Sequence, residues 1–299
     1  MPNTTLSFKQ KKTDEVVIDN HNSPFNLATM KGLVYGVSRK IEWKDVPKPV
    51  IEKPTDALVK VLKTTICETD PGTLYYNVAM VKPGTVLGHE GLGVIEEVGT
   101  AVMNFKKGDH VIISCITSDG TCEYCKKKMY SHCEDGGWIL GRLINGTQAE
   151  FVRIPHADNS LCLIPAGADE EVLGVLNDIL PTGHEIGVLN GNVKAGDTIA
   201  IVGAGPIGMS ILLGSQFYSP TKIYVIDVDT NRLEMAKTFG ATDIINAGKE
   251  DVVKRIMAET KGGVDVAIEA VGEPVSFDIC HQIVRPGGHV ANIGYMVSL

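Results

Sequence analysis

The glycine-rich run GAGPIG, residues 203–208, follows the apolar stretch TIAIV and leads into a helix-like pattern. At such a junction Gly203 makes the tight turn, Gly205 lets a pyrophosphate approach the backbone, and Gly208 lets the helix pack on the strand. The start of the helix offers free N–H groups and the positive end of its dipole to phosphates. The residues predicted to form this phosphate site are Gly203, Gly205, Pro206, Ile207 and Gly208.

Short apolar runs alternate with helix-like stretches through the rest of the C-terminal half. The runs are IAIVG, IYVID, DIIN, VDVAIEAVG and HVANIGY, and stretches such as NRLEMAKTFG separate them. This alternation predicts βαβ units, a parallel sheet and right-handed crossovers. Ligands of such sheets bind beyond the carboxyl ends of the strands, so we also assign Ile293, in the last run, to the nucleotide site.

Asp227 ends the run IYVID, about twenty residues after the glycine run. A carboxylate at this place accepts both ribose hydroxyls and repels a 2′-phosphate, so the sequence favours NAD over NADP. Arg232 keeps NADP open, because a nearby arginine can accommodate the additional phosphate. The alternative is that the glycines form only a turn and that Asp227 is only a solvated strand end.

The composition indicates a globular protein large enough for two domains. Of its 299 residues 43% are hydrophobic, which allows a sizeable core. The net charge of -8 gives no electrostatic footprint for nucleic acid or an anionic membrane. No apolar run approaches the roughly twenty residues of a membrane helix, and residues 1–30 lack the apolar core of a secretory signal. We therefore expect a cytoplasmic protein without nucleic-acid or membrane partners.

Changes in polarity and in the pattern of apolar residues divide the chain into three parts. Residues 1–29 are polar and aperiodic, which predicts a flexible extension. Residues 30–180 contain short β-type runs separated by Pro/Gly turns, which predicts a mostly β domain. Residues 181–299 contain the βαβ series and are assigned to the nucleotide-binding domain.

The run DGTCEYCKKKMYSHC, residues 119–133, places three cysteines and one aspartate in a short span. An odd total of seven cysteines without an export signal indicates reduced thiols, and clustered thiols indicate a metal. The spacing suits a lobe around one tetrahedral zinc ion, which accepts carboxylate oxygen as well as thiolate sulfur. The alternative is three surface thiols with the aspartate as a turn residue. The predicted structural zinc ligands are Asp119, Cys122, Cys125 and Cys133.

Four further potential ligands are dispersed along the chain. Cys67 lies in TTICETD, and Asp178 lies in NDILPTGHE. His89 and Glu90 lie in LGHEG. Each alone has an ordinary explanation, since an isolated cysteine or histidine is more often a core residue than a ligand. Together a thiolate, an imidazole and a carboxylate leave a tetrahedral zinc ion one open position for substrate.

The order of Cys67, GHE, the cysteine lobe, Asp178 and GAGPIG resembles the zinc-dependent alcohol dehydrogenases of the medium-chain dehydrogenase/reductase superfamily. The resemblance covers nearly everything from Met30 to the C-terminus. It implies an α/β protein, with a GroES-like β-barrel catalytic domain that carries zinc and a Rossmann doubly wound parallel sheet. It also implies zinc and NAD as cofactors, and reversible hydride transfer between NAD and a small primary or secondary alcohol and its aldehyde or ketone.

The resemblance gives the two predicted zinc sites different roles. The catalytic site takes Cys67, His89 and Asp178 as ligands. Glu90 matches a neighbouring carboxylate that can enter this zinc shell transiently. The cysteine lobe matches the structural zinc site of the family, in which a cysteine stands where this chain has Asp119. We expect this substitution to weaken zinc retention without abolishing it.

The residues after Cys67 carry the proton path implied by the resemblance. Thr69 matches the hydroxyl that takes the proton of the alcohol, and Asp70 matches the carboxylate that orients the ligand histidine. Many relatives have CGTDxH where this chain has CETDPG, so Glu68 replaces a glycine and Gly72 replaces a relay histidine. We expect a shortened relay, and backbone strain at Glu68 if its φ is positive.

The resemblance also predicts that a C-terminal segment is missing. The chain ends at NIGYMVSL after the fifth predicted strand, whereas the family continues with a sixth strand, a helix and a return segment. Family members are homo-oligomers, and losing these elements exposes a sheet edge and apolar surface. We therefore expect an incomplete Rossmann sheet, reduced stability and altered or absent dimerisation.

Two functions stay open on the sequence. The first is an active NAD-dependent zinc alcohol dehydrogenase with a small alcohol or carbonyl substrate. The second is a catalytically impaired relative that retains nucleotide or metal binding, which the altered loop at Cys67 and the end of the chain support. A zinc-free quinone reductase is disfavoured because such enzymes lack this ligand set. Polyol and threonine dehydrogenases stay within the enzyme class.

Overall fold

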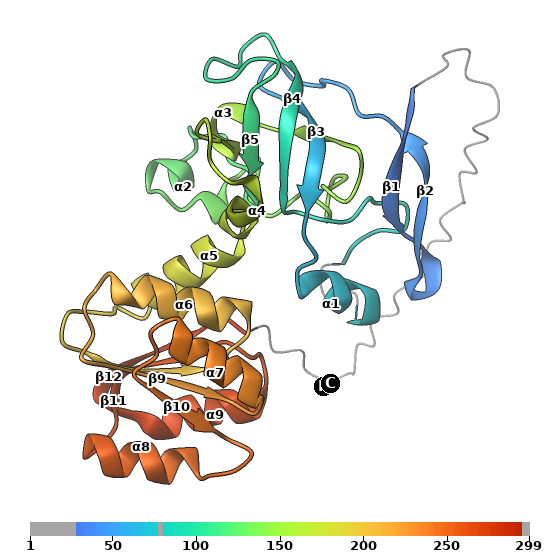
Figure 1. Cartoon of the computed structure of the whole chain (residues 1–299). Coiled ribbons are helices and arrows are strands. Elements are labelled where there is room, and N and C mark those ends of the chain that lie inside the picture. Colours follow the sequence, from blue (N-terminus) through green and yellow to red (C-terminus); the bar gives the residue numbers. More distant parts are fainter. Residues whose placement is uncertain (1–27, 77–79, 295–299) are drawn as a thin grey trace, which may run out of the picture.

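The computed structural model describes residues 28–76 and 80–294, and Figure 1 shows them as two halves joined by a short helical link. The N-terminal half lies above the C-terminal half in this view. The predicted flexible extension, residues 1–29, lies outside the described residues except for its last two, and Thr29 is the first residue of a strand.

The N-terminal half is built from two antiparallel sheets. Its strands are β1 (Thr29–Tyr35), β2 (Ile41–Pro47), β3 (Ala57–Thr64), β4 (Gly91–Val98), β5 (His110–Ile113), β6 (Phe151–Ile154) and β7 (Leu161–Leu163). β1 pairs with β2, and the other five strands form a sheet in the order β6-β3-β4-β5-β7. Bridges from Gly32 to Ala149 and from Val34 to Val86 attach the smaller sheet to neighbouring segments.

Apolar side chains of the five-stranded sheet, joined by Leu140 from a loop and Ala157 from the segment after β6, form the core of this half. The buried members are Ala57, Val59, Ile95, Val111, Ile113, Leu140, Val152, Ile154, Ala157 and Leu161. Short helices connect the strands. They are η1 (Val37–Arg39), α1 (Thr69–Tyr76), α2 (Glu123–Lys126), η2 (Tyr130–His132), α3 (Ala157–Ser160), α4 (Glu170–Leu173) and η3 (Gly174–Leu176).

The link between the halves consists of α5 (Ile179–Thr182) and the π-helix η4 (Gly183–Leu189). Both pack on α6 (Pro206–Gln216), the first helix of the C-terminal half, as Figure 1 shows for α5. The Ser210 hydroxyl donates a hydrogen bond of 2.9 Å to the carbonyl of Ile179. The link is therefore fastened to α6 at its first residue.

The C-terminal half alternates strands and helices. After α6 its elements are β9 (Lys222–Asp227), α7 (Thr230–Thr238), β10 (Asp243–Asn246), α8 (Val252–Thr260), β11 (Val264–Glu269), α9 (Pro274–Ile283) and β12 (Val284–Asn292), and β8 (Thr198–Val202) precedes α6. The strands are parallel in the order β10-β9-β8-β11-β12. Residues of α6 and α7 pack in the core on one face, and residues of α8 and α9 pack on the other.

This topology confirms the predicted doubly wound parallel sheet. The strand order reverses between β8 and β11, and ligands of such sheets bind in the crevice at this point. The predicted boundary between residues 180 and 181 falls inside α5 and stays a prediction, as does a missing C-terminal segment. In the described ranges, no helix has the length and apolar character needed to cross a bilayer.

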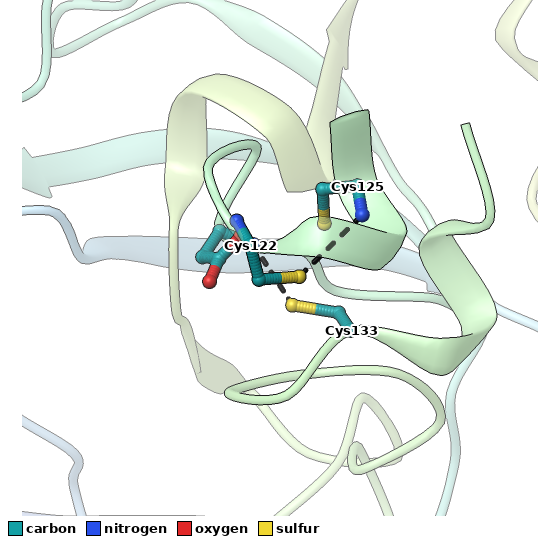
Figure 2. A group of neighbouring side chains, drawn as sticks. Cys122, Cys125 and Cys133 are labelled. Carbon is teal, nitrogen blue, oxygen red and sulfur yellow. Dashed lines mark hydrogen bonds between the residues drawn. The ribbon is translucent and has the colours of Figure 1, made fainter. Parts of the chain in front are cut away.

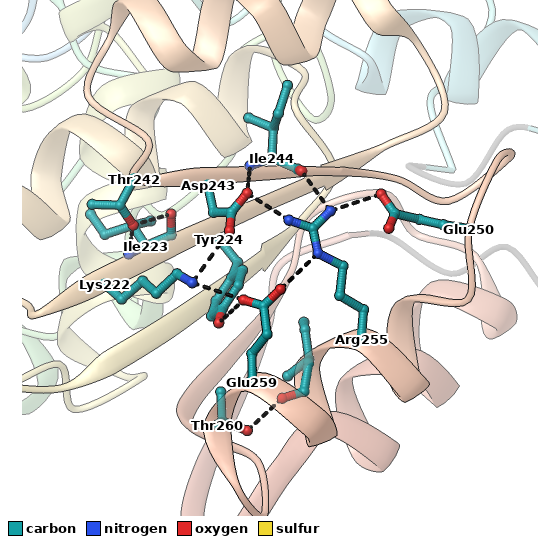
Figure 3. A network of polar contacts seen from close by, with 11 residues as sticks. Lys222, Ile223, Tyr224, Thr242, Asp243, Ile244, Glu250, Arg255, Glu259 and Thr260 are labelled. Atoms are coloured by element: carbon teal, nitrogen blue, oxygen red, sulfur yellow. Dashed lines mark hydrogen bonds and ion pairs between the residues drawn. The ribbon is translucent and has the colours of Figure 1, made fainter.

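A network of charged side chains ties α8 to β9 and β10, and Figure 3 shows it. Arg255 donates to Asp243 and to Glu250, each at 2.8 Å. Glu259 accepts from Arg255 at 3.0 Å and from Lys222 at 2.8 Å. The hydrogen bond from Lys222, together with those from its neighbours, lowers the pKa of Glu259 from 4.5 to about 2.

We expect Glu259→Gln to destabilise the fold at neutral pH by about 1 kcal/mol, a value reduced by solvent screening because the Glu259 side chain is 35% exposed. The folded pKa of Glu259 lies below its unfolded value, so the ionised group stabilises the fold above pH 4.5. This contribution falls as the pH drops from 4.5 towards 2. Urea unfolding followed by circular dichroism at pH about 7 and about 3.5 measures the loss, which shrinks in acid.

Glu234→Gln is the matched control for this prediction. Glu234 lies on α7 and pairs at 3.5 Å with Lys237, and both side chains are mostly exposed. Exposed ion pairs contribute little to stability. An equal loss in the two variants, or a loss in Glu259→Gln that does not depend on pH, would contradict the assigned role of the network.

Candidate functional site

Four potential metal ligands from distant parts of the sequence meet at one place in the N-terminal half. They are Cys67, His89, Glu90 and Asp178, and one ligand atom of each lies within 4.8 Å of the others. Cys67 lies just before α1, and Asp178 lies just before α5. His89 and Glu90 are buried just before β4. The structure thus brings together the residues of the predicted catalytic zinc site, and we call this group the Cys67 cluster.

His89 lies between acidic groups in this cluster. Its Nε2 is 3.1 Å from Oδ2 of Asp178 and 3.8 Å from Oε1 of Glu90. Burial disfavours a proton on the imidazole, but hydrogen bonds with Asp178 and Cys67 outweigh burial and raise the pKa of His89 to about 10. Surroundings that attract one positive charge so strongly also attract a divalent cation, which displaces the proton when it binds the neutral ring. The donor set of sulfur, nitrogen and oxygen therefore fits zinc.

Asp70 holds the loop that carries Cys67. Its Oδ2 accepts hydrogen bonds from the backbone N–H of Cys67 at 3.0 Å and from Nε2 of Gln148 at 2.9 Å. Burial raises the pKa of Asp70, and the hydrogen bond from Cys67 opposes this effect. Asp70 is thus in place to orient the thiol ligand, and its action on the ring of His89 stays a prediction.

Two buried side-chain oxygens have no hydrogen-bond partner within residues 28–76 and 80–294, one in a member of the Cys67 cluster and one two residues after Cys67. They are Oγ1 of Thr69 and Oε1 of Glu90. A buried polar atom without a partner costs about 1–3 kcal/mol, so a ligand that contacts either atom gains free energy. Glu68 is not among the described residues with a positive φ, so the backbone strain considered for it is absent.

Figure 2 shows the cysteine lobe, in which Cys122, Cys125 and Cys133 turn their sulfur atoms towards one another. These sulfurs and a carboxylate oxygen of Asp119 all lie within 4.8 Å of one another. Sγ of Cys122 accepts from the N–H of Cys125 at 3.4 Å, and Sγ of Cys133 accepts from the N–H of Asp119 at 3.2 Å. The lobe therefore presents three sulfurs and one carboxylate in the arrangement that a tetrahedral zinc ion needs.

Asp119 has a second task in this lobe. Its Oδ1 accepts from the N–H groups of Thr121 at 2.7 Å and Cys122 at 3.0 Å. The hydrogen bond from Cys122, followed by that from Thr121, holds the pKa of Asp119 well below its ordinary value. Asp119 therefore stays ionised, which suits a metal ligand, and it also shapes the turn.

The glycine run adopts the geometry predicted for a phosphate loop. Gly203 has a φ of +108°, and a Cβ on Gly208 would lie 1.9 Å from the carbonyl oxygen of Gly203. Gly205 has open space among the described residues where its Cβ would be, so a ligand can approach its backbone. Pro206 begins α6, and Ile207 packs against the core behind the loop. Contact of these residues with a cofactor stays a prediction.

Asp227 belongs to the same loop structure. Its Oδ2 accepts from the N–H of Ala204 at 2.7 Å, and its Oδ1 accepts from the N–H of Asp229 at 2.8 Å. Nη1 of Arg232 lies 4.0 Å from Asp227. Ile293 lies at the carboxyl end of the sheet, where its N–H donates to the last residue of β11 at 2.9 Å. Asp227, Arg232 and Ile293, the three residues assigned to the nucleotide site besides the loop, thus lie at the carboxyl edge of the strands or on the helix that follows.

Sequence reasoning missed three side chains that contact the Cys67 cluster. They are Thr65, which donates to Oε2 of Glu90, Thr182, which donates to Oδ1 of Asp178, and Trp138, whose ring centroid lies 5.8 Å from that of His89 in an edge-on contact. Thr65 and Thr182 lie two and four residues from a predicted ligand, and this nearness is the signal that could have found them. Trp138 gives no such signal.

Comparisons with known proteins cover both halves of the chain. A family described as the alcohol dehydrogenase GroES-like domain matches residues 53–166. A second family, described as zinc-binding dehydrogenase, matches residues 195–298. Together with the parallel sheet, these matches confirm the predicted GroES-like and Rossmann fold classes.

Relatives with known names match most of the chain. An alcohol dehydrogenase of Cupriavidus necator is 36% identical over 288 residues, which are 91% of this chain and 78% of the relative. An NADP-dependent isopropanol dehydrogenase of Entamoeba histolytica is 33% identical over 273 residues, which are 90% of this chain and 74% of the relative. The apo structure of zinc-dependent alcohol dehydrogenase 2 from Streptococcus pneumonia is 51% identical, with a TM-score of 0.85, and the match covers 89% of this chain and 76% of that one.

We predict that Asp119→Ala removes one zinc ion per chain and leaves the other in place. Loss of the carboxylate leaves three sulfur ligands and also removes the acceptor of two backbone N–H groups. Metal analysis by mass spectrometry after dialysis measures the zinc content. Asp119→Cys is the control, and it keeps both ions because thiolate is a good zinc ligand. Unchanged zinc content in Asp119→Ala would show that the carboxylate is only a turn residue.

Proposed function

Because the chain belongs to the zinc-dependent alcohol dehydrogenase family of the medium-chain dehydrogenase/reductase superfamily, we propose that it is an NAD-dependent zinc alcohol dehydrogenase. It transfers a hydride reversibly between NAD and a small primary or secondary alcohol and its aldehyde or ketone. The convergence of thiol, imidazole and carboxylate in the Cys67 cluster carries this proposal. The names of the relatives support the same chemistry.

Cys67, His89 and Asp178 would hold zinc, and the glycine loop would hold the dinucleotide. When bound, zinc would supply Lewis acidity towards an alcohol oxygen, and NAD would supply the hydride acceptor. Thr182 and Asp70 fix the ligands, because they hydrogen-bond the carboxylate of Asp178 and the backbone of Cys67.

We assign to Thr69 the role of taking the proton of the alcohol. Its Oγ1 is buried and has no partner among the described residues, so it can accept from a hydroxyl at the open side of the cluster. Thr69 also begins α1, which fixes its backbone two residues after Cys67. A threonine hydroxyl can accept one proton only as it passes another on, so it acts as a relay.

Asp227 supports NAD as the preferred cofactor. Its side chain is only 8% exposed, and two backbone N–H groups fix both of its oxygens. A carboxylate held in this way can accept ribose hydroxyls and repels a 2′-phosphate. Arg232, which is 58% exposed, is a feature that favours the additional phosphate carried by NADP.

A second candidate function is a catalytically impaired relative that binds nucleotide or metal without turnover. Gly72 favours it, because this residue stands within α1 at the position that the family resemblance assigns to a relay histidine. The relay histidine that the resemblance places three residues after Thr69 would then be missing from α1. Binding of zinc and NAD without NADH formation separates this function from the first.

We expect the zinc-loaded chain to form NADH with short primary or secondary alcohols, and Asp178→Asn to lower kcat/KM by at least about 100-fold. The amide keeps the shape of the side chain but loses the charge that a zinc ligand needs. Spectrophotometric NADH formation with a panel of alcohols measures the effect. Asp45→Asn, a charge change in an exposed ion pair on β2, is the control and keeps full activity. Absence of NADH formation from a chain with bound zinc and NAD would favour the impaired relative.

Cofactor preference gives a separate prediction. Asp227→Asn removes the negative charge, and we expect the ratio of kcat/KM for NAD over NADP to fall by about tenfold or more. Asp229→Asn is the control, because asparagine still caps α7 and the charge removed lies two residues further along the chain. An equal change in both variants, or a wild-type preference for NADP, would contradict the role assigned to Asp227.

A further inference from the structure

Glu90 is fixed through its backbone by two hydroxyl groups. Its carbonyl accepts from Oγ1 of Thr64 at 2.7 Å and from Oγ1 of Thr147 at 2.8 Å. Thr64 ends β3 and lies opposite Gly91, the first residue of β4, in the antiparallel register. Because the backbone cannot shift, Glu90 can change its distance to the rest of the Cys67 cluster only by turning its side chain.

The two carboxylate oxygens of Glu90 have different surroundings. Oε2 accepts a hydrogen bond from Oγ1 of Thr65. Oε1 is buried, has no hydrogen-bond partner in the described ranges and lies 3.8 Å from Nε2 of His89. The residue as a whole is only 1% exposed, so water does not compete for either oxygen. Thr65 is therefore the tether that opposes a turn of this carboxylate towards the ligands.

Thr65 is itself held from its other side. Its carbonyl accepts from Nε2 of Gln148 at 3.4 Å, and the same amide donates to Asp70 at 2.9 Å. Thr65 also lines a cavity of about 460 Å³ together with Leu62, Leu92 and residues before α5. It thus stands in the wall between this cavity and Glu90, and a smaller side chain would open that wall.

We propose that the hydroxyl of Thr65 is a positioning group that holds Glu90 back from a metal ion in the Cys67 cluster and so sets how fast the ion is released. This inference rests on the proposed function, because it requires that the cluster binds a metal. It adds a residue outside the ligand set that controls whether a fourth protein ligand joins the shell.

The direction of the effect follows from the cost of burying a carboxylate without partners. Without the Thr65 hydroxyl, neither oxygen of Glu90 has a donor among its described neighbours. The nearest source of compensating positive charge is then a metal ion bound beside His89. Oε1 of Glu90, which has no hydrogen-bond partner among the described residues, already lies 3.8 Å from Nε2 of His89. The carboxylate of Glu90 would then coordinate the ion for a larger fraction of the time, which would slow release of the ion.

We expect Thr65→Val to slow release of the cluster's metal by about tenfold. A tenfold change corresponds to about 1.4 kcal/mol, close to the lower end for a hydrogen bond to a charged group. Valine keeps the volume of threonine and therefore keeps the cavity wall closed. Release of Co²⁺ from the cobalt-loaded full chain into excess chelator, without alcohol or NAD, is followed by visible absorption. The component that a Cys67→Ser variant lacks is assigned to the cluster.

Three further variants make the test specific. Thr65→Ser keeps the hydroxyl and restores the wild-type rate. Thr64→Val removes a neighbouring hydroxyl that bonds the backbone carbonyl of Glu90 and the hydroxyl of Thr147 but not the carboxylate of Glu90. Thr147 still donates to the carbonyl, so we expect the rate to stay within about twofold. In a Glu90→Gln background the Thr65→Val change has no effect, because the charge that would turn towards the ion is gone.

A wild-type or faster release rate in Thr65→Val overturns the inference, and so does a slowing that persists in the Glu90→Gln background. If Thr65→Val does not fold, as judged by circular dichroism, the same cycle is run with Thr65→Ile, which also removes the hydroxyl and keeps the cavity wall closed, with the same expected sign. Failure of the proposed function would look different. In that case the variants would change cobalt release as expected while the zinc-loaded chain formed no NADH from alcohols.

Discussion

The packing of α5 on α6 is the contact on which the whole site depends. Asp178 precedes α5, and the glycine loop precedes α6, so this contact sets the position of the metal cluster relative to the nucleotide crevice. The hydrogen bond from Ser210 to the carbonyl of Ile179 fixes the first turn of α5 on the nucleotide helix. A Cβ on Gly183, the first residue of η4, would lie 2.5 Å from Oγ of Ser210, which shows how closely the link approaches α6. Hydride transfer tolerates little error in the distance between reacting atoms, and in the proposed function this joint would supply that precision.

The parts of the site that could be predicted from the sequence are those whose partners lie within a few residues. The lobe at 119–133 and the loop at 203–208 are local structures, so spacing alone indicates their geometry. Cys67, His89 and Asp178 are far apart in the chain, and only the resemblance to a family placed them together. Residues that act through a third partner, such as Thr65 and Gln148, depend on the register of β3 with β4 and β6, which no local pattern encodes.

Asp119 shows that two interpretations of one residue can both hold. The sequence offered a choice between a metal ligand and a turn residue, and the structure shows the carboxylate shaping the turn while it lies beside the three sulfurs. One oxygen accepts two backbone N–H groups, and a carboxylate oxygen lies with the three sulfurs. The N–H groups keep the aspartate ionised, so the turn prepares the group for a cation. Asp227 also combines a structural and a binding role, because its hydrogen bonds stabilise the phosphate loop beside which the ribose would lie.

The edge-on contact between Trp138 and His89 has a practical consequence. The chain has two tryptophans, and the other, Trp43, is 58% exposed on β2. Trp138 lies with its ring centroid 5.8 Å from the imidazole, within the N-terminal half that holds the cluster. We expect its emission to differ from that of a solvated indole and to respond to the charge of the neighbouring ring. The protein therefore carries an intrinsic fluorescent reporter, which a Trp43→Phe background would isolate for following events at the cluster without any added dye.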